Sequence, residues 1–203
     1  MRVELPRFYI VCAAYVVLIF LKIVLCVTGA SGAAYAVRLA QELKKARAEL
    51  SVVVTDSAKK VFAYEEPGAL AALRKCSKTY SESEIDAPFA SGSAKFDAVI
   101  VCPCSMKTLA AISCGFAYNS VCRAADVALK ERKKLVLVPR ETPLHEIHLE
   151  NMLKLARMGV VILPACPGFY HSPKKAGDLV DFVVGKVLDS LGVENNVFKR
   201  WKS

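Results

Sequence analysis

The sequence predicts an α/β fold, a doubly wound parallel sheet in a single domain. After Lys22, strand and helix signals alternate along the chain, which is typical of a parallel sheet with crossover helices. The strand signals are short runs of Val, Ile and Leu without polar alternation, as in strands that are buried on both faces. At 203 residues, the chain has the length of one ordinary domain.

The expected elements follow one another with short connections. Strands are expected over Lys22–Val27, Leu50–Thr55, Ala98–Cys102, Leu135–Pro139 and Val160–Pro164. The spacing of apolar residues predicts helices over Ala33–Arg47, Ser57–Glu65, Ala69–Cys76, Ser105–Cys114, Ala124–Arg132, His145–Met158 and Asp178–Leu191. No linker is long enough to separate two domains.

Residues 1–20 precede this alternation and have a different character. Phe8 to Phe20 is a mostly apolar run behind Arg2 and Arg7, a composition found in signal peptides. No small-residue cleavage site follows, and a membrane helix of about 20 residues would have to include Lys22 and the first strand. We therefore expect an upstream extension over residues 1–20 and a functional domain over residues 21–203. The alternative is membrane association through residues 8–20.

Charge and cysteine usage narrow the class of ligand. Lysine and arginine exceed acidic residues by 28 to 19, but they are dispersed and form no nucleic-acid motif. We therefore expect a phosphate-bearing small molecule and no nucleic acid as partner. Most of the 8 cysteines lie within apolar runs, as buried free thiols do. Cys102-Pro103-Cys104 has no second pair at zinc-ligand spacing, so we expect no metal. Free thiols are typical of a reducing compartment, so we expect a cytoplasmic location.

Loops at the carboxyl ends of the strands are the expected ligand site, because ligands bind there in doubly wound sheets. In Thr28–Gly32, free backbone N–H groups at a helix start would attract an anion. Ser105 stands where an N-cap is expected, and capping alone would explain it. A neutral phosphate cradle would also explain the hydroxyls of Thr108, Ser91 and Ser93.

Charged residues near strand ends leave two interpretations open. Arg123 and Lys130 share one face of a helix, where Asp126 could pair with both of them. Arg140 and Glu141 follow a strand directly. They form either a structural ion pair or an acid–base group in a cleft.

Two other enzyme classes do not fit the sequence. Short-chain dehydrogenases have glycines at the positions of Ala33 and Tyr35. Their catalytic Tyr-x-x-x-Lys pair would fall on Tyr170 and Lys174, but Pro173 interrupts the helix that this pair needs. Zinc proteases of the zincin type bind the metal with two histidines at positions i and i+4 of a helix. His145 and His148 are only three residues apart, one too few for this pair. We expect these two histidines on a helix surface.

Eight short motifs follow one another along the chain: Thr28–Gly32, Ala90–Ser93, Cys102–Ser105, Arg123–Asp126, Lys130–Arg132, Val138–Pro143, His148–Lys154 and Pro167–His171. Taken in this order, they resemble one family, the flavin prenyltransferases of the UbiX/Pad type. The resemblance runs from about Ile23 to the end of the chain.

This resemblance implies a Rossmann-like subunit of a dodecamer, with flavin mononucleotide (FMN) bound where subunits meet. It implies that reduced FMN is joined to dimethylallyl phosphate through nitrogen-5 and then carbon-6. The product, prenylated FMN, would serve a decarboxylase of the UbiD type. No metal takes part in this family.

The resemblance also implies roles for individual residues. It assigns FMN binding to Gly29, Ala30, Ser31, Thr55, Ser105, Met106, Lys107, Thr108, Arg123, Arg140 and Trp201. It assigns binding of the prenyl phosphate to Ser91, Lys130, Tyr170 and Lys186. The implied catalytic residues are Ser31 and Glu65, which would move a proton at the flavin edge, together with Lys130 and Glu141. Glu141 would protonate the leaving phosphate.

Two positions depart from the family pattern. Lys186 stands where arginine is frequent. An ammonium group therefore replaces a guanidinium that could bind the phosphate through two nitrogens. Ile85 stands where many members have tryptophan. We expect less aromatic shielding of the prenyl cation and an altered preference between phosphate and diphosphate donors.

Two other functions remain as alternatives. One is a non-catalytic FMN carrier or accessory subunit of a decarboxylase. The other is an FMN-dependent cysteine decarboxylase, a group whose members resemble one another in an early histidine base. No histidine precedes His145 in this chain, which counts against the second alternative.

Overall fold

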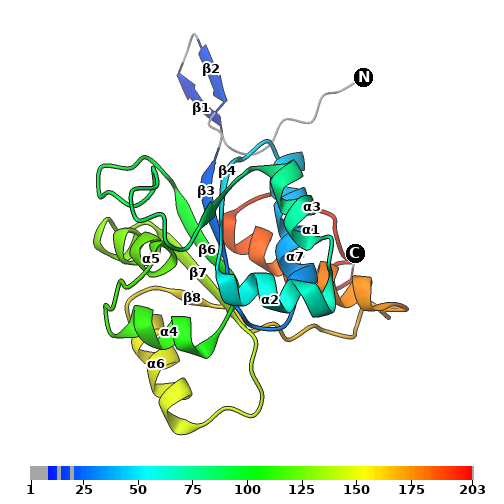
Figure 1. Ribbon diagram of the computed structural model, residues 1–203. Coiled ribbons are helices and arrows are strands. Elements are labelled where there is room, and N and C mark those ends of the chain that lie inside the picture. Colours follow the sequence, from blue (N-terminus) through cyan, green and yellow to red (C-terminus); the bar gives the residue numbers. More distant parts are fainter. Residues whose placement is uncertain (1–8, 13–14, 19–20, 203) are drawn as a thin grey trace.

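A six-stranded parallel sheet forms the centre of the molecule (Figure 1). The computed structural model describes residues 9–12, 15–18 and 21–202. The strand order is β5-β4-β3-β6-β7-β8, and every neighbouring pair is parallel. The strands are β3 (Lys22–Val27), β4 (Glu49–Val54), β5 (Lys78–Ser81), β6 (Ala98–Cys104), β7 (Lys134–Pro139) and β8 (Val161–Ile162). The predicted fold class is therefore confirmed.

Helices cover both faces of this sheet (Figure 1). One face packs against α1 (Ala33–Lys45), α2 (Asp56–Glu65), α3 (Ala69–Cys76) and α7 (Ala176–Leu191). The other face packs against α4 (Met106–Ser113), α5 (Ser120–Lys130) and α6 (Glu146–Arg157). Successive residues of β3 point to opposite faces, so Leu25 joins the first core and Cys26 the second. Each fully buried aliphatic side chain stabilises the fold by about 1.5–3 kcal/mol.

Most predicted elements are present, with shifted ends. The strand over Lys22–Val27 and the helix over Ala69–Cys76 have the predicted bounds. Helix α5 begins at Ser120 rather than Ala124, because the Asn119 side chain caps it by accepting a hydrogen bond from Cys122 N (2.9 Å). Strand β5 was not expected, since its sequence, Lys-Thr-Tyr-Ser, has no apolar run.

The N-terminal segment contains a separate strand pair. Strands β1 (Tyr9–Cys12) and β2 (Tyr15–Leu18) pair antiparallel in a sheet of their own, and Figure 1 shows this hairpin projecting from the body. The other positions of the predicted extension, 1–8, 13–14 and 19–20, lie outside the described residues, so the extension stays a prediction. Among the described residues, no helix has both the length and the apolar character needed to cross a membrane.

Candidate active site

Two hollows flank the Thr28–Gly32 loop at the carboxyl ends of the strands. The first, about 240 Å³, is lined by Thr28, Gly29, Thr55, Ser57, Glu82, Ser105, Lys107, Thr108 and Tyr118. The second, about 310 Å³, is lined by Ser31, Gly32, Ala34, Tyr35, Glu65, Glu66, Arg140, Ala165 and Val180. The structure thus brings together most of the predicted FMN-binding residues.

Hydroxyl groups and helix starts dominate the first hollow. The Ser105 hydroxyl caps α4 by accepting from Thr108 N (3.4 Å) and lies 3.1 Å from the Thr108 hydroxyl. Thr28 Oγ1 accepts from Ser105 N (2.8 Å) and donates to the Pro103 carbonyl (2.8 Å). Thr55 caps α2 by accepting from Ala58 N (3.1 Å). Two helix N-termini and several neutral donors therefore meet here, an arrangement suited to a phosphate.

Gly29 allows the loop to pass close to α2. A Cβ atom at this position would lie 2.5 Å from Ser57 Cβ, so Ser57 or the loop would have to move to make room for it. The backbone can approach a ligand closely at such a glycine. Of the other predicted FMN-binding residues, Ala30 is buried, and Met106, the first residue of α4, packs into the second core.

Glu82 and Tyr118 are lining residues that sequence reasoning missed. Glu82 accepts hydrogen bonds from Asp56 N (2.8 Å) and from the Asn119 side-chain amide (2.6 Å), so it joins the starts of α2 and α5. The Lys107 ammonium lies 5.6 Å from the Tyr118 ring centroid. Asparagine is a favoured N-cap residue, so Asn119 could have predicted a helix start beside Glu82 and Tyr118.

A carboxylate and a hydroxyl meet in the second hollow. Glu65 Oε2 accepts hydrogen bonds from Gly32 N (2.8 Å) and Ala33 N (2.9 Å) at the start of α1. Burial alone would raise the pKa of Glu65, but hydrogen bonds from Ser31, Ala33 and Gly32, with the nearby Arg140 charge, outweigh it and lower that pKa. The lowered pKa favours the ionised form of Glu65, which lies in this hollow together with Ser31, so this carboxylate can accept a proton.

Arg140 and Glu141 have different partners. Arg140 Nε donates to the Ser31 carbonyl (3.3 Å), which ties the end of β7 to the first loop. Glu141 Oε1 accepts from the backbone N–H of Thr142 (3.0 Å) and is exposed. Tyr35, another lining residue that the sequence did not identify, shares this hollow with Arg140.

A cationic cluster lies beside α5, on the second face of the sheet. Arg123 Nη1 pairs with Asp126 (2.9 Å), and its Nε donates to the Ala90 carbonyl (2.9 Å). Lys130 Nζ lies above the Ser91–Ser93 turn, where a Cβ at Gly92 would be only 2.7 Å from it. Asp126 thus has an ion pair with Arg123, while Lys130 has its nearest carboxylate in Glu131 (3.7 Å).

The other candidate phosphate-binding residues lie beside α7, on the opposite face. The Tyr170 ring packs edge-on against Trp201, with 5.2 Å between ring centroids. Lys186 Nζ lies 3.9 Å from the Asp189 carboxylate. Figure 1 shows α5 and α7 on opposite sides of the sheet. One chain therefore does not bring Ser91 and Lys130 together with Tyr170 and Lys186.

Residues 170–175 are not helical, as Pro173 predicts. His145 is exposed, whereas His148 is half-buried and its ring stacks on that of His145 (3.4 Å between centroids). Within the described part of the chain, no group of His, Cys, Asp or Glu is arranged to hold a metal ion. Ile85 is 70% exposed.

Comparison with known proteins assigns the class and the family. The Flavoprotein family profile matches residues 19–188. The flavin prenyltransferase UbiX of Methanocaldococcus jannaschii is 50% identical over 182 residues, covering 89% of this chain and 98% of that protein. A dodecameric FMN-dependent UbiX-like decarboxylase from Escherichia coli O157:H7 superposes with a TM-score of 0.87 at 44% identity, covering 90% of this chain and all of that one.

A second solved structure carries ligands. AnUbiX (PadA1), in complex with FMN and dimethylallyl pyrophosphate, superposes with a TM-score of 0.88 at 41% identity, over 91% of this chain and 98% of that one. The parallel sheet, together with the match to the Flavoprotein profile, identifies the chain as an α/β flavoprotein. Within that class, the chain belongs to the flavin prenyltransferase family represented by UbiX.

Proposed function

We propose that this protein transfers a dimethylallyl group from dimethylallyl phosphate to reduced FMN and releases prenylated FMN for a UbiD-type decarboxylase. The observation that carries the proposal is the Ser31–Glu65 pair beside the hydroxyl-lined hollow, in a chain half identical to a UbiX protein. The complex of AnUbiX with FMN and dimethylallyl pyrophosphate supports both ligand classes.

The first hollow fits FMN by the chemistry of its donors. The Ser105 and Thr108 hydroxyls and the free N–H groups at the start of α4 would bind the phosphate without adding positive charge. Gly29 and Thr55 would line the approach of the ribityl chain and ring, and Arg140 would lie at the other side of the loop. Reduced FMN supplies the nucleophilic ring in this reaction.

Ser31 and Glu65 would handle the proton that the flavin loses. The lowered pKa of Glu65 favours its ionised form, and Ser31 lines the same hollow, so Glu65 would accept a proton relayed by the Ser31 hydroxyl. Its bonds to Gly32 N and Ala33 N hold it at the start of α1 without a conformational change. Such preorganisation lowers the cost of reaching the transition state.

Departure of the allylic phosphate needs positive charge and a proton donor. Lys130 and Ser91 would supply one side of the phosphate site, with Arg123 beside them. Tyr170 and Lys186 would supply the other side, and Glu141 the proton. Because α5 and α7 cover opposite faces of the sheet, we propose that the two sides come from different subunits of a cytoplasmic homododecamer (Figure 1). The dodecamer of the E. coli relative supports this assembly.

The test is an anaerobic incubation of the purified protein with reduced FMN and dimethylallyl phosphate, followed by mass spectrometry of the released flavin. We expect the flavin to gain one five-carbon unit, and Glu141→Gln to slow this gain by about 10²-fold or more. Glu146→Gln, in the first turn of α6, is the matched control and should behave as wild type.

An unmodified flavin with both the phosphate and the diphosphate donor would contradict the proposal. That result would favour the FMN carrier, which binds the flavin but performs no transfer. A preference for the diphosphate would leave the activity in place and direct attention to Ile85 and Lys186 as the residues that set donor choice.

A further inference from the structure

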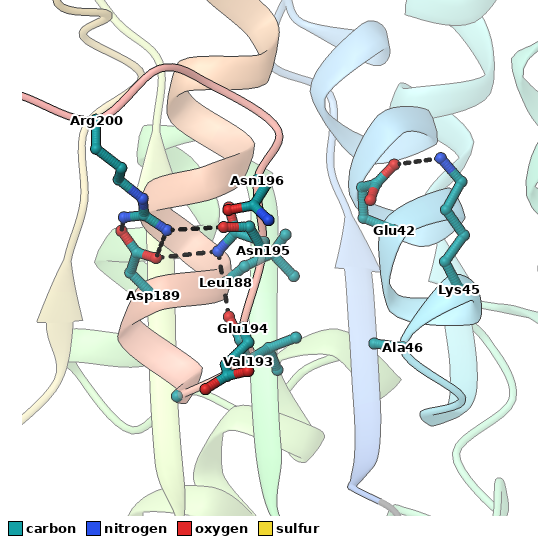
Figure 2. A pocket seen from close by; sticks show the side chains of 11 residues that line it. Glu42, Lys45, Ala46, Leu188, Asp189, Val193, Glu194, Asn195, Asn196 and Arg200 are labelled. Carbon is teal, nitrogen blue, oxygen red and sulfur yellow. Dashed lines mark hydrogen bonds and ion pairs between the residues drawn. The ribbon is translucent and has the colours of Figure 1, made fainter. Parts of the chain in front are cut away.

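An ionic cluster joins the end of α7 to the C-terminal segment. Figure 2 shows it on one wall of a hollow of about 700 Å³, opposite Glu42 and Lys45 of α1. Arg200 pairs with Asp189 through both terminal guanidinium nitrogens, Nη1 to Oδ2 at 2.5 Å and Nη2 to Oδ1 at 2.8 Å. The Asn195 side-chain amide donates to Asp189 Oδ1 (3.0 Å), and the backbone carbonyl of Asn195 accepts from Arg200 Nη2 (3.1 Å).

This pair is partly shielded from solvent, which makes it stronger than an ordinary surface ion pair. The Asp189 side chain is 25% exposed and that of Arg200 39%. Burial alone would raise the pKa of Asp189, but hydrogen bonds from Arg200 and Asn195 outweigh it and hold that pKa below its ordinary value. A two-point contact between a guanidinium and a carboxylate also fixes their relative orientation.

Aromatic packing fixes the path of the chain just before this contact. Phe198 is buried against Phe182, with 5.0 Å between ring centroids, and the Arg200 guanidinium lies 4.7 Å from the Phe198 ring. Phe198 also crosses α7 at Gly185, where a Cβ atom would be 2.4 Å from its ring. The segment is therefore held at Phe198 and again at Arg200.

Trp201 follows this double attachment directly. Its ring is 66% exposed and packs edge-on against Tyr170. Tyr170 in turn packs against Phe182 (5.7 Å between centroids). Asp189 also faces Lys186, one helical turn earlier on α7, at 3.9 Å. Asp189 thus contacts Arg200, which directly precedes Trp201 in the chain. It also lies near Lys186, a proposed ligand of the prenyl phosphate.

We propose that Asp189 is a positioning residue: through Arg200 it holds the Trp201 ring against Tyr170, and it orients Lys186 on the same side. The consequence for binding of the prenyl phosphate rests on the proposed function, because Tyr170 and Lys186 would be its ligands. The consequence for the position of Trp201 does not rest on it.

The experiment uses the only tryptophan of the chain as a reporter. Asp189→Asn keeps the size of the side chain and removes its charge, in the full-length oligomeric protein. We expect a changed Trp201 emission spectrum and faster acrylamide quenching, because the contact with Tyr170 loosens. For dimethylallyl phosphate we expect KM to rise about fivefold, which corresponds to about 1 kcal/mol, with a smaller change in kcat.

Asp181→Asn is the matched control. Asp181 lies on the same helix, is also 25% exposed and pairs with Arg38 at 2.5 Å, but it faces α1 rather than the C-terminal segment. We expect it to lose a similar amount of stability while the emission of Trp201 and the KM stay at wild-type values. Arg200→Lys, which keeps the charge and loses the two-point contact, should fall between wild type and Asp189→Asn.

The outcomes separate this proposal from the proposed function. If Asp189→Asn leaves Trp201 emission unchanged, or changes it no more than Asp181→Asn, the positioning role is wrong. If emission changes but KM does not, Asp189 holds Trp201 without affecting the substrate, and the role in the site is wrong. If emission changes and even the wild-type protein transfers no prenyl group, the proposed function fails while the anchoring of Trp201 stands.

Discussion

At the residue scale, Glu65 accepts hydrogen bonds from the start of α1 and is also the proposed proton acceptor beside Ser31. Glu65→Gln keeps the shape and removes the charge. We expect the free energy of unfolding to fall by about 0.5–1 kcal/mol, the usual effect of losing a charged acceptor at a helix start. Transfer should slow by about 10²-fold or more if the carboxylate takes the proton. Denaturant unfolding and single-turnover assays measure the two effects.

Glu66→Gln is the control for this change. Glu66 lines the same hollow and is the next residue in the chain. We expect its stability and transfer rate to stay near wild type. Equal losses in the two variants would show that general charge in the hollow, rather than the Glu65 contacts, is responsible.

The depressed pKa of Glu65 gives a pH dependence of known sign. A carboxyl whose pKa is lower in the folded state stabilises the fold fully above its unfolded value, about 4.3 for glutamate, and loses that contribution as pH falls through the folded pKa. The stability difference between wild type and Glu65→Gln should therefore shrink as pH falls below about 4.3. Urea unfolding across this range measures it, and a difference that grows towards acid pH would contradict the assignment.

Four buried thiols should be chemically inert in the folded protein. Burial raises the pKa of Cys102 to about 12 and that of Cys122 to about 11, and it also raises the pKa values of Cys26 and Cys104. Because the thiolate is the reactive form, we expect N-ethylmaleimide at pH 7 to leave these four unmodified until the protein is unfolded. Peptide mass spectrometry identifies the modified residues, and exposed Cys166 serves as the internal positive control. Rapid labelling of any of the four would show that the core opens.

At the level of elements, the sequence predicted the central strands well, because Val, Ile and Leu runs that are buried on both faces leave a clear signal. Strand β5 was not predicted, because it is a mostly polar strand at the edge of the sheet. Its strand structure is defined only by its pairing with β4. Glu82 follows directly after this strand, so its contacts with α2 and Asn119 were equally hidden. Local patterns report burial, whereas these contacts depend on which segments meet in space.

Gly29 belongs to the Thr28–Gly32 loop, which separates the two hollows. We expect Gly29→Ala to reduce stability by about 1–3 kcal/mol and to weaken FMN binding, because the new methyl group would have to displace Ser57. Gly68→Ala is the control, since a Cβ at Gly68 meets no atom within 4 Å and the backbone there is ordinary, with φ −83°. Thermal unfolding and FMN titration measure both variants. A Gly29→Ala protein with wild-type FMN affinity would exclude close approach of the ligand at this loop.

At the scale of the whole molecule, the candidate residues divide into those around the two hollows, proposed for FMN, and two clusters proposed for the prenyl phosphate. The order of strands and loops predicted that Thr28–Gly32 and Ser105–Thr108 lie near each other, because they follow neighbouring strands of one sheet. It could not show that Lys130 and Lys186 lie on opposite faces, since that depends on the layer each helix joins. Residues with one inferred role can thus be far apart in a single chain.

This division predicts that two inactive variants restore each other. Lys130→Gln and Lys186→Gln should each lose most transfer activity. When they are unfolded and refolded together, a site built from two subunits would regain about a quarter of wild-type activity, because half of each contributing surface is intact and the two assort at random. Lys130→Gln mixed with Arg123→Gln is the control, since both residues belong to α5 and no mixed site would contain both cations. Recovery in the first mixture alone would place the phosphate site between subunits, whereas no recovery in either mixture would require Lys130 and Lys186 to act within one chain.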